Sequence, residues 1–180
     1  ALQALAFEIL AADPALSVEP KQQLAIILGL ARACGANGMA GGQVLDLGSL
    51  GREISQPELE QIHAFKTGAL IQICTVAPAL LALATADQIN ALSRFGQLTG
   101  LAFQVFDDLL DVTGNSELTG KPSQADAARS KPAFPAIIGV ERSLQRAHEL
   151  RDQAQTELNY LPGDTNALDW LAAYAVDRDR

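Results

Sequence analysis

Residues 100–112 constrain the fold most, because as a helix they are apolar around most of their circumference. At about 100° per residue, their polar side chains occupy an arc of roughly 100°. These side chains are Gln104, Asp107, Asp108 and Asp111, and after Gly100 the other positions hold only Leu, Ala, Phe and Val. A surface helix would show a broader polar face. The pattern therefore predicts a helix that others surround, with a narrow acidic stripe facing something specific.

The rest of the chain is also typical of helices. Among its 180 residues, 48% are hydrophobic and only 5% are aromatic. No alternation of polar and apolar residues persists for long enough to predict a strand. Short loops between long helices make neighbouring helices antiparallel. We therefore predict an all-α protein, an antiparallel helical bundle in which residues 1–180 form a single domain.

Capping signals and breakers set the expected helix boundaries. Ser55 with Glu58, and Thr85 with Gln88, each have the spacing of a capping box. The first helix begins without a cap, which suggests that Ala1 is not a natural terminus. Glycines in the second helix weaken it by up to about 1 kcal/mol each and indicate close approach of another backbone or a ligand. The expected helices cover about 1–13, 21–47, 56–84, 86–112, 134–161 and 166–178.

The charge balance limits the classes of partner. The net charge is −8 and the sequence pI is about 4.6, which argues against nucleic acid, because that partner needs a basic surface. An anionic substrate remains compatible, since a bound cation can invert the local field. Cys34 and Cys74 are isolated in the sequence, so neither a disulfide framework nor a zinc site is expected. A cytoplasmic location fits these cysteines best.

No membrane span is expected. Residues 67–86 hold no charge, but Gln72, Thr75 and the mid-segment Pro78 interrupt them. These residues favour the buried helix of a soluble bundle over a span. The sequence also shows no signal peptide.

The aspartates of the central stripe indicate a metal ion. Asp107 and Asp111 are four residues apart on the predicted helix, so their carboxylates repel each other unless a cation lies between them. No Lys or Arg occurs in residues 95–120, and oxygen ligands on a rigid helix suit Mg²⁺. The alternative is a solvated helix face, although aspartates near a helix C-terminus oppose the helix dipole.

Two lysines are candidates for binding an anion. Lys66 lies on an apolar stripe of its predicted helix, where a lysine either extends to solvent or points into a polar cavity. Lys121 follows Gly120 in a polar loop, where a lysine is usually just solvated. Together with the acidic stripe, one inward lysine and one loop lysine are what a diphosphate group needs.

Five ordered segments resemble one protein family. They are GMAGGQVLDL (38–47), HAFKTGAL (63–70), GLAFQVFDDLLDVTG (100–114), TGKPSQAD (119–126) and KPAFP (131–135). With them the chain resembles the trans-isoprenyl diphosphate synthases, or polyprenyl synthetases, and among these the bacterial short-chain farnesyl type. The resemblance implies a helical bundle around a central cavity. This chain would be the later and larger part of such an enzyme, without its N-terminal helices, its first aspartate-rich segment and its isopentenyl diphosphate site.

The resemblance also implies catalytic and binding residues. Asp107 and Asp111 would bind Mg²⁺, with Mn²⁺ as a substitute, on the diphosphate of an allylic substrate, and Asp108 would support them. Phe103 would lie near the isopentenyl group. The residues expected to grip the allylic diphosphate are Lys66, Thr67, Gln104, Lys121 and Lys131.

Other residues of the matching segments receive a structural role from the resemblance. These are Gly41, Gly42, Gln43 and Asp46, which would belong to a helix that lines the cavity. His63 and His148 are isolated in the sequence and are interpreted as ordinary helix residues. The final DRDR is similar to a basic tail that folds over the second substrate in relatives.

The implied activity is prenyl transfer. An allylic diphosphate (dimethylallyl or geranyl) would condense with isopentenyl diphosphate, through an allylic carbocation that forms as metal ions and lysines stabilise the leaving diphosphate. Relatives pair through long helices, so a homodimer is expected. Two alternatives stay open. A non-catalytic regulatory subunit would be expected to lose the acidic motif, and a terpene cyclase would release diphosphate without isopentenyl diphosphate.

Overall fold

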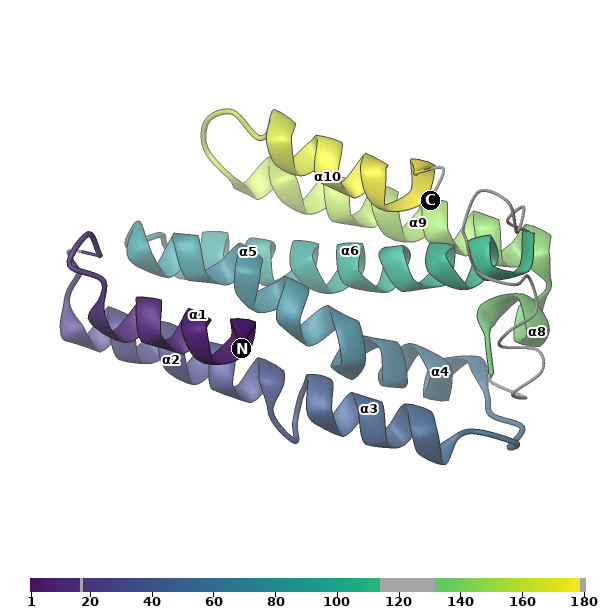
Figure 1. Cartoon of the computed structure of the whole chain (residues 1–180). Coiled ribbons are helices and arrows are strands. Elements are labelled where there is room, and N and C mark those ends of the chain that lie inside the picture. The colour runs from purple at the N-terminus through teal and green to yellow at the C-terminus, as the bar shows by residue number, and fades with distance from the viewer. Residues whose placement is uncertain (17, 114–131, 179–180) are drawn as a thin grey trace.

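The computed structural model describes residues 1–16, 18–113 and 132–178, and all regular structure in these residues is helical. The all-α prediction is confirmed. The elements are α1 (Leu2–Ala12), α2 (Pro20–Cys34), α3 (Met39–Gly48), α4 (Gln56–His63), the π-helical turn η1 (Ala64–Gly68), α5 (Ala69–Leu81), α6 (Ala86–Thr113), α8 (Phe134–Ile138), α9 (Val140–Glu157), the 3₁₀ turn η3 (Leu158–Tyr160) and α10 (Asn166–Asp177). In Figure 1, α6 runs between α9 and α10 on one side and α1 to α4 on the other.

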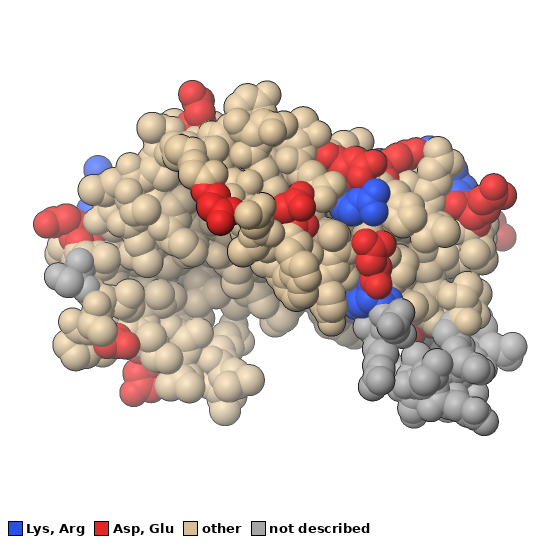
Figure 2. All heavy atoms as spheres, turned by 90° about the horizontal axis from the view of Figure 1, so that it is seen from above, with Lys and Arg blue, Asp and Glu red and all other residues tan. Residues whose placement is uncertain are grey.

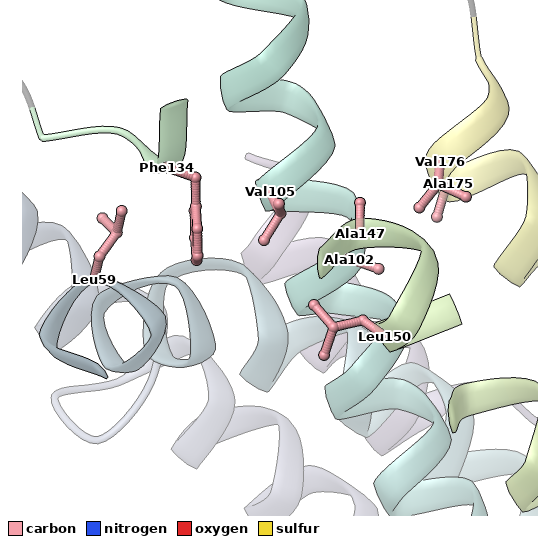
Figure 3. Close-up of a cluster of buried hydrophobic side chains, with 8 residues drawn as sticks. All are labelled: Leu59, Ala102, Val105, Phe134, Ala147, Leu150, Ala175 and Val176. Carbon is pink, nitrogen blue, oxygen red and sulfur yellow. The ribbon is translucent and has the colours of Figure 1, made fainter. Parts of the chain in front are cut away.

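Helix α6 is the central element of the bundle. It packs against α5, α9, α10, α8 and the turn η1, as predicted from its narrow polar stripe. Ala102 and Val105, on its apolar side, are fully buried. Burying a side chain such as Leu, Val or Phe contributes about 1.5–3 kcal/mol relative to leaving it exposed. Figure 3 shows the cluster that forms here, which comprises Leu59, Ala102, Val105, Phe134, Ala147, Leu150, Ala175 and Val176.

Both predicted capping boxes lie at helix starts. The backbone N–H of Glu58 donates to Ser55 Oγ over 3.4 Å at the start of α4. At the start of α6, the N–H of Gln88 donates to Thr85 Oγ1 over 3.3 Å, and Gln88 Oε1 accepts from the N–H of Thr85 over 2.9 Å. These bonds satisfy N–H groups that the first helical turn leaves without partners. The predicted helix starts are therefore confirmed.

Two of the expected helices are wrong, because each is broken at glycine. The helix expected over 21–47 ends at Cys34 and starts again at Met39. A Cβ on Gly38 would lie 2.2 Å from the carbonyl oxygen of Ala33, so the chain turns too tightly there for any other residue. The helix expected over 134–161 breaks at Gly139, whose φ of 82° suits glycine alone.

Glycines also let η1 lie close to its neighbours. A Cβ on Gly42 of α3 would lie 2.3 Å from the backbone nitrogen of Lys66, and a Cβ on Gly100 of α6 would lie 2.8 Å from the Cα of Gly68. The expectation that glycines mark close backbone approach holds at Gly42. Since η1 is held between α3 and α6, its side chains are positioned by backbone packing on two sides.

Two helical stretches satisfy the length and composition of a membrane span. They are Pro20–Gly48 and Gln56–Leu81, although core helices of soluble proteins satisfy the same test. The first stretch is interrupted between α2 and α3. The two also contact each other through a polar group, because Gln22 Nε2 donates to the carbonyl oxygen of Leu80 over 2.8 Å. The absence of a membrane span stays a prediction.

The face of the molecule that carries α9 and α10 has both acidic and basic side chains. Figure 2 shows them separated by uncharged residues, with the acidic ones more numerous. Two of the arginines of α9 are paired: Arg142 Nη1 lies 2.8 Å from Glu149 Oε1, and Arg146 Nε lies 3.1 Å from Glu60 Oε1. On this face, therefore, much of the positive charge is already compensated.

Candidate functional site

The turn η1 presents Lys66 and Thr67 to two different helices. It is a π-helical turn inserted between α4 and α5, in which the N–H of Ala69 donates to the carbonyl of Ala64. Such turns are rare and occur frequently at functional sites, because the extra residue changes the direction of the side chains. Here Lys66 reaches toward α3, whereas Thr67 reaches toward α6. The sequence predicts an uninterrupted helix over about 56–84, so the π-helical turn is a departure from that prediction.

Lys66 forms an ion pair that sequence reasoning missed. Its Nζ lies 2.6 Å from Asp46 Oδ2, and the two side chains are 28% and 10% exposed. Lys66 therefore neither extends freely into solvent nor points into an empty cavity. Asp46 was expected on a helix that lines the cavity, in a role more structural than catalytic. The signal that could have found the ion pair is one acidic residue within the small-residue segment GMAGGQVLDL.

Thr67 and Gln104 are brought into direct contact. Thr67 Oγ1 donates to Gln104 Oε1 over 2.9 Å across the interface between η1 and α6. Gln104 is buried, so its amide is held by the protein rather than by water. Two polar side chains from segments 37 residues apart in the chain thus meet beside the acidic stripe.

Asp107 has a counter-charge from the far end of the chain. Arg178 Nη2 lies 3.1 Å from Asp107 Oδ1 and 3.3 Å from the carbonyl oxygen of Phe103. Its Nη1 donates to the carbonyl oxygen of Ala175 over 2.7 Å, and its guanidinium lies 3.8 Å from the centre of the Phe103 ring. The side chain of Arg178 is 5% exposed and that of Asp107 is 44% exposed. The terminal arginines were the only sequence signal for this contact.

Asp108 does not share the exposed position of Asp107. It is 3% exposed, and its Oδ2 accepts from His63 Nε2 over 3.2 Å and from the backbone N–H of Phe134 over 3.1 Å. His63 is a helix residue, as expected, but its buried contact with Asp108 was not predicted from the sequence. The helical wheel placed Asp108 in the same narrow arc as Asp107, but it gave no information on which of the two another helix covers.

The remaining predicted site residues fall into two groups. Asp111 is partly buried and takes part in a polar interaction. Lys121 and Lys131 lie outside the described residues. Among the described residues, no cluster of three or more His, Cys, Asp or Glu side chains is placed to hold a metal ion. Asp107 and Asp111 therefore need further ligands, such as water or phosphate oxygens, to form a magnesium site.

A cavity of about 510 Å³ lies beside η1, within the usual size of ligand pockets. Its wall includes Ala64, Phe65 and Gly68 of the η1 turn together with Leu98 and Leu101 of α6. The backbone that carries Lys66 and Thr67 therefore also borders a largely apolar space. The wall also includes Asn37, Gln72, Arg94 and Gln97, but neither Lys66 nor Thr67 itself.

These features define an all-helical bundle protein in which a π-helical turn contacts a central helix that carries Asp107, Asp108 and Asp111. The chain belongs to the polyprenyl synthetase family, whose model matches residues 1–161.

Two proteins to which this chain is similar are farnesyl diphosphate synthases. The chain is 40% identical to farnesyl diphosphate synthase of Escherichia coli (strain K12) over 187 residues, covering 100% of this chain and 62% of that protein. It is 41% identical to farnesyl diphosphate synthase of Haemophilus influenzae, covering 99% of this chain and 60% of the relative. The chain thus spans about three fifths of the length of these relatives.

Solved structures show the same fold. A FPP/GFPP synthase from Zymomonas mobilis superposes with a TM-score of 0.84 at 33% identity, covering 97% of this chain and 58% of the other. A geranyltransferase from Helicobacter pylori, complexed with magnesium and isoprenyl diphosphate, superposes with a TM-score of 0.79 at 26% identity, covering 97% and 56%.

Proposed function

We propose that the full-length protein is a short-chain prenyltransferase. It condenses an allylic diphosphate, dimethylallyl or geranyl, with isopentenyl diphosphate to give a longer prenyl diphosphate of the farnesyl type. The allylic C–O bond breaks, a C–C bond forms, a proton is lost from the condensed chain, and diphosphate leaves. The observation that carries this proposal is the meeting of Thr67 with Gln104, one turn before Asp107, in a chain of the polyprenyl synthetase family.

Asp107 and Asp111 are the residues that would hold Mg²⁺, or Mn²⁺ in its place. Their carboxylate oxygens suit a hard cation. Only Oδ1 of Asp107 is engaged by Arg178, and a carboxylate offers about four acceptor positions, so a cation and the arginine can share it. When bound, the ion would neutralise the negative charge of the leaving diphosphate.

The side chains of η1 and α6 bind and orient the diphosphate. Lys66 donates charge-assisted hydrogen bonds to phosphate oxygens in place of its bond to Asp46. The Thr67 hydroxyl, which now donates to Gln104 Oε1, would exchange this bond for one to a phosphate oxygen, and the Gln104 amide nitrogen would donate beside it. The apolar cavity beside Phe65 and Leu101 accepts the prenyl chain and keeps water from the cationic centre.

Homodimerisation is part of the same proposal. Apolar side chains of α1, α2 and α3 are exposed in the single chain, and such faces are typical of interaction surfaces. They include Leu2 (84%), Leu24 (65%), Val44 (69%) and Leu47 (59%). A second copy is the occupant that we propose for them.

Substitution of Lys66 tests whether this residue binds the allylic diphosphate. We expect Lys66→Ala to raise the KM for the allylic diphosphate by about 10–100-fold, because a hydrogen bond to a charged group contributes about 1.5–3 kcal/mol. Steady-state kinetics with each substrate varied in turn measures this. Lys21→Ala, which removes an exposed lysine from the first turn of α2, serves as the control. An unchanged KM in Lys66→Ala would remove this residue from the site.

An omission assay tests the function itself. The full-length protein is incubated with radiolabelled isopentenyl diphosphate, an allylic diphosphate and Mg²⁺, and both the prenyl product and released diphosphate are quantified. We expect product only when all three are present. Diphosphate released without isopentenyl diphosphate would favour a terpene cyclase, and no turnover by the isolated protein would favour a non-catalytic subunit.

A further inference from the structure

A buried polar junction joins three helices next to the candidate site. The carboxylate oxygen Oδ2 of Asp108, on α6, accepts hydrogen bonds from His63 Nε2, on α4, and from the backbone N–H of Phe134, the first residue of α8. The exposed fractions of Asp108, His63 and Phe134 are 3%, 1% and 0%. The rings of His63 and Phe134 also stack, with centroids 5.7 Å apart and planes inclined by 25°. Figure 3 shows Phe134 between α4 and α6.

Burial restricts the positions that the side chains of the junction can adopt. A buried carboxylate is stable only with well-placed donors, and charge-assisted bonds of this kind are strong and directional. His63 Nδ1 has no hydrogen-bond partner among the described residues. Of the two ring nitrogens, only Nε2 therefore orients the imidazole through a hydrogen bond to a described residue. Removing this donor would leave α4 and α6 joined there through apolar packing.

The position of the junction in the chain links it to the proposed diphosphate site. His63 is the last residue of α4, directly before η1, and Lys66 follows three residues later. Asp108 is the neighbour of Asp107 on α6. The bond between His63 and Asp108 therefore spans from the helix that leads into the lysine turn to the helix that carries the carboxylates. A small rotation of one helix against the other would change the distance between Lys66 and Asp107.

We propose that His63 is a positioning residue for the allylic diphosphate, and that it acts through Asp108. This inference rests on the proposed function. By fixing the end of α4, directly before η1, to α6, His63 holds Lys66 and Asp107 at a set separation. Reacting and binding groups tolerate little displacement, since misplacement by about 1 Å lowers activity by about 100-fold. Asp108, in turn, serves as the anchor of this junction and not as a ligand to the metal.

The test compares three substitutions in the full-length protein. His63→Leu keeps an apolar side chain of similar bulk but removes the donor, whereas His63→Gln can donate from its amide at a position close to Nε2. Thr99→Val is the control, because Thr99 is a buried residue of α6 whose Oγ1 has no hydrogen-bond partner among the described residues. If His63→Leu does not fold, His63→Met replaces it, since methionine adapts to irregular gaps.

Three readouts separate positioning from stability. Calorimetric titration with a non-reactive allylic thiolodiphosphate in the presence of Mg²⁺ gives Kd, steady-state kinetics gives kcat and the KM of each substrate, and thermal melting gives Tm. For His63→Leu we expect a Kd raised about tenfold or more, a KM raised for the allylic substrate but not for isopentenyl diphosphate, and recovery of both values in His63→Gln. Thr99→Val should bind the analogue as the unmodified protein does.

Two results would overturn the inference. One is a wild-type Kd in His63→Leu despite a lower Tm, which would make the junction purely structural. The other is equal loss of binding in His63→Leu and His63→Gln, which would exclude the donor as the cause. Failure of the unmodified protein itself to bind the analogue would instead overturn the proposed function, so the two failures are distinguishable.

Discussion

Asp107→Ala is expected to abolish prenyl transfer by the full-length protein while the fold remains intact. The side chain of Asp107 is 44% exposed, so its removal leaves no buried cavity. Arg178 would lose one partner but keep the carbonyl oxygens of Phe103 and Ala175. Because the side chain of Arg178 is only 5% exposed, losing its counter-charge should lower the stability of the variant, but the two carbonyl acceptors and the Phe103 ring still hold the guanidinium. The loss of activity should appear in kcat, by about a hundredfold or more, as for other groups that stabilise developing charge.

The control for this prediction is Asp87→Ala. Asp87 is an exposed aspartate in the first turn of the same helix, α6. Both variants are compared with the unmodified protein by product formation and by circular dichroism. Wild-type kcat in Asp107→Ala would contradict the assignment of this residue, whereas reduced activity in Asp87→Ala would indicate a general effect of charge on α6.

Gly42→Ala is expected to destabilise the folded protein strongly. Its new Cβ would lie 2.3 Å from the nitrogen and 2.6 Å from the Cα of Lys66, so α3 and η1 would have to separate. Overpacking of this kind costs about 1–3 kcal/mol. Because the displaced backbone carries Lys66 and Thr67, activity should fall together with stability. The urea midpoint of unfolding and kcat/KM for the allylic diphosphate measure the two effects.

Gly48→Ala is the matched control in the same helix. A Cβ at Gly48 would have no neighbour within 4 Å, and alanine is favoured over glycine in helices by up to about 1 kcal/mol. We expect this variant to be as stable as the unmodified protein or more stable, with unchanged activity. A Gly42→Ala variant that behaves like Gly48→Ala would show that η1 does not depend on its close contact with α3.

Local signals were sufficient for most of the fold. The start of α6 was predicted because Thr85 and Gln88 form a self-contained capping box, and its central position followed from its narrow polar stripe. The break between α2 and α3 was missed because a glycine in a helical sequence is compatible with two different structures. It permits close approach, as at Gly42, and it permits a turn, as at Gly38; periodicity alone does not distinguish the two.

The contacts of the candidate site depend on tertiary structure that the sequence does not display. His63 and Asp108 are 45 residues apart, and Arg178 and Asp107 are 71 residues apart. No local pattern relates such pairs. The residue types of the site were recognised through the family resemblance, but the division between the exposed Asp107 and the buried Asp108 needed the positions of α4 and α8. The π-helical turn was also missed, because its sequence AFKTG has no local feature that distinguishes it from an ordinary α-helix.

The most direct test of this account is a crystal structure of the full-length protein with Mn²⁺ and a non-reactive allylic thiolodiphosphate. We expect the diphosphate to contact Lys66, Thr67 and Gln104, with anomalous scattering from manganese beside Asp107 and Asp111. Lys66 should then have exchanged Asp46 for a phosphate oxygen. A diphosphate bound elsewhere, with Lys66 still paired to Asp46 and no manganese on α6, would contradict the proposed function.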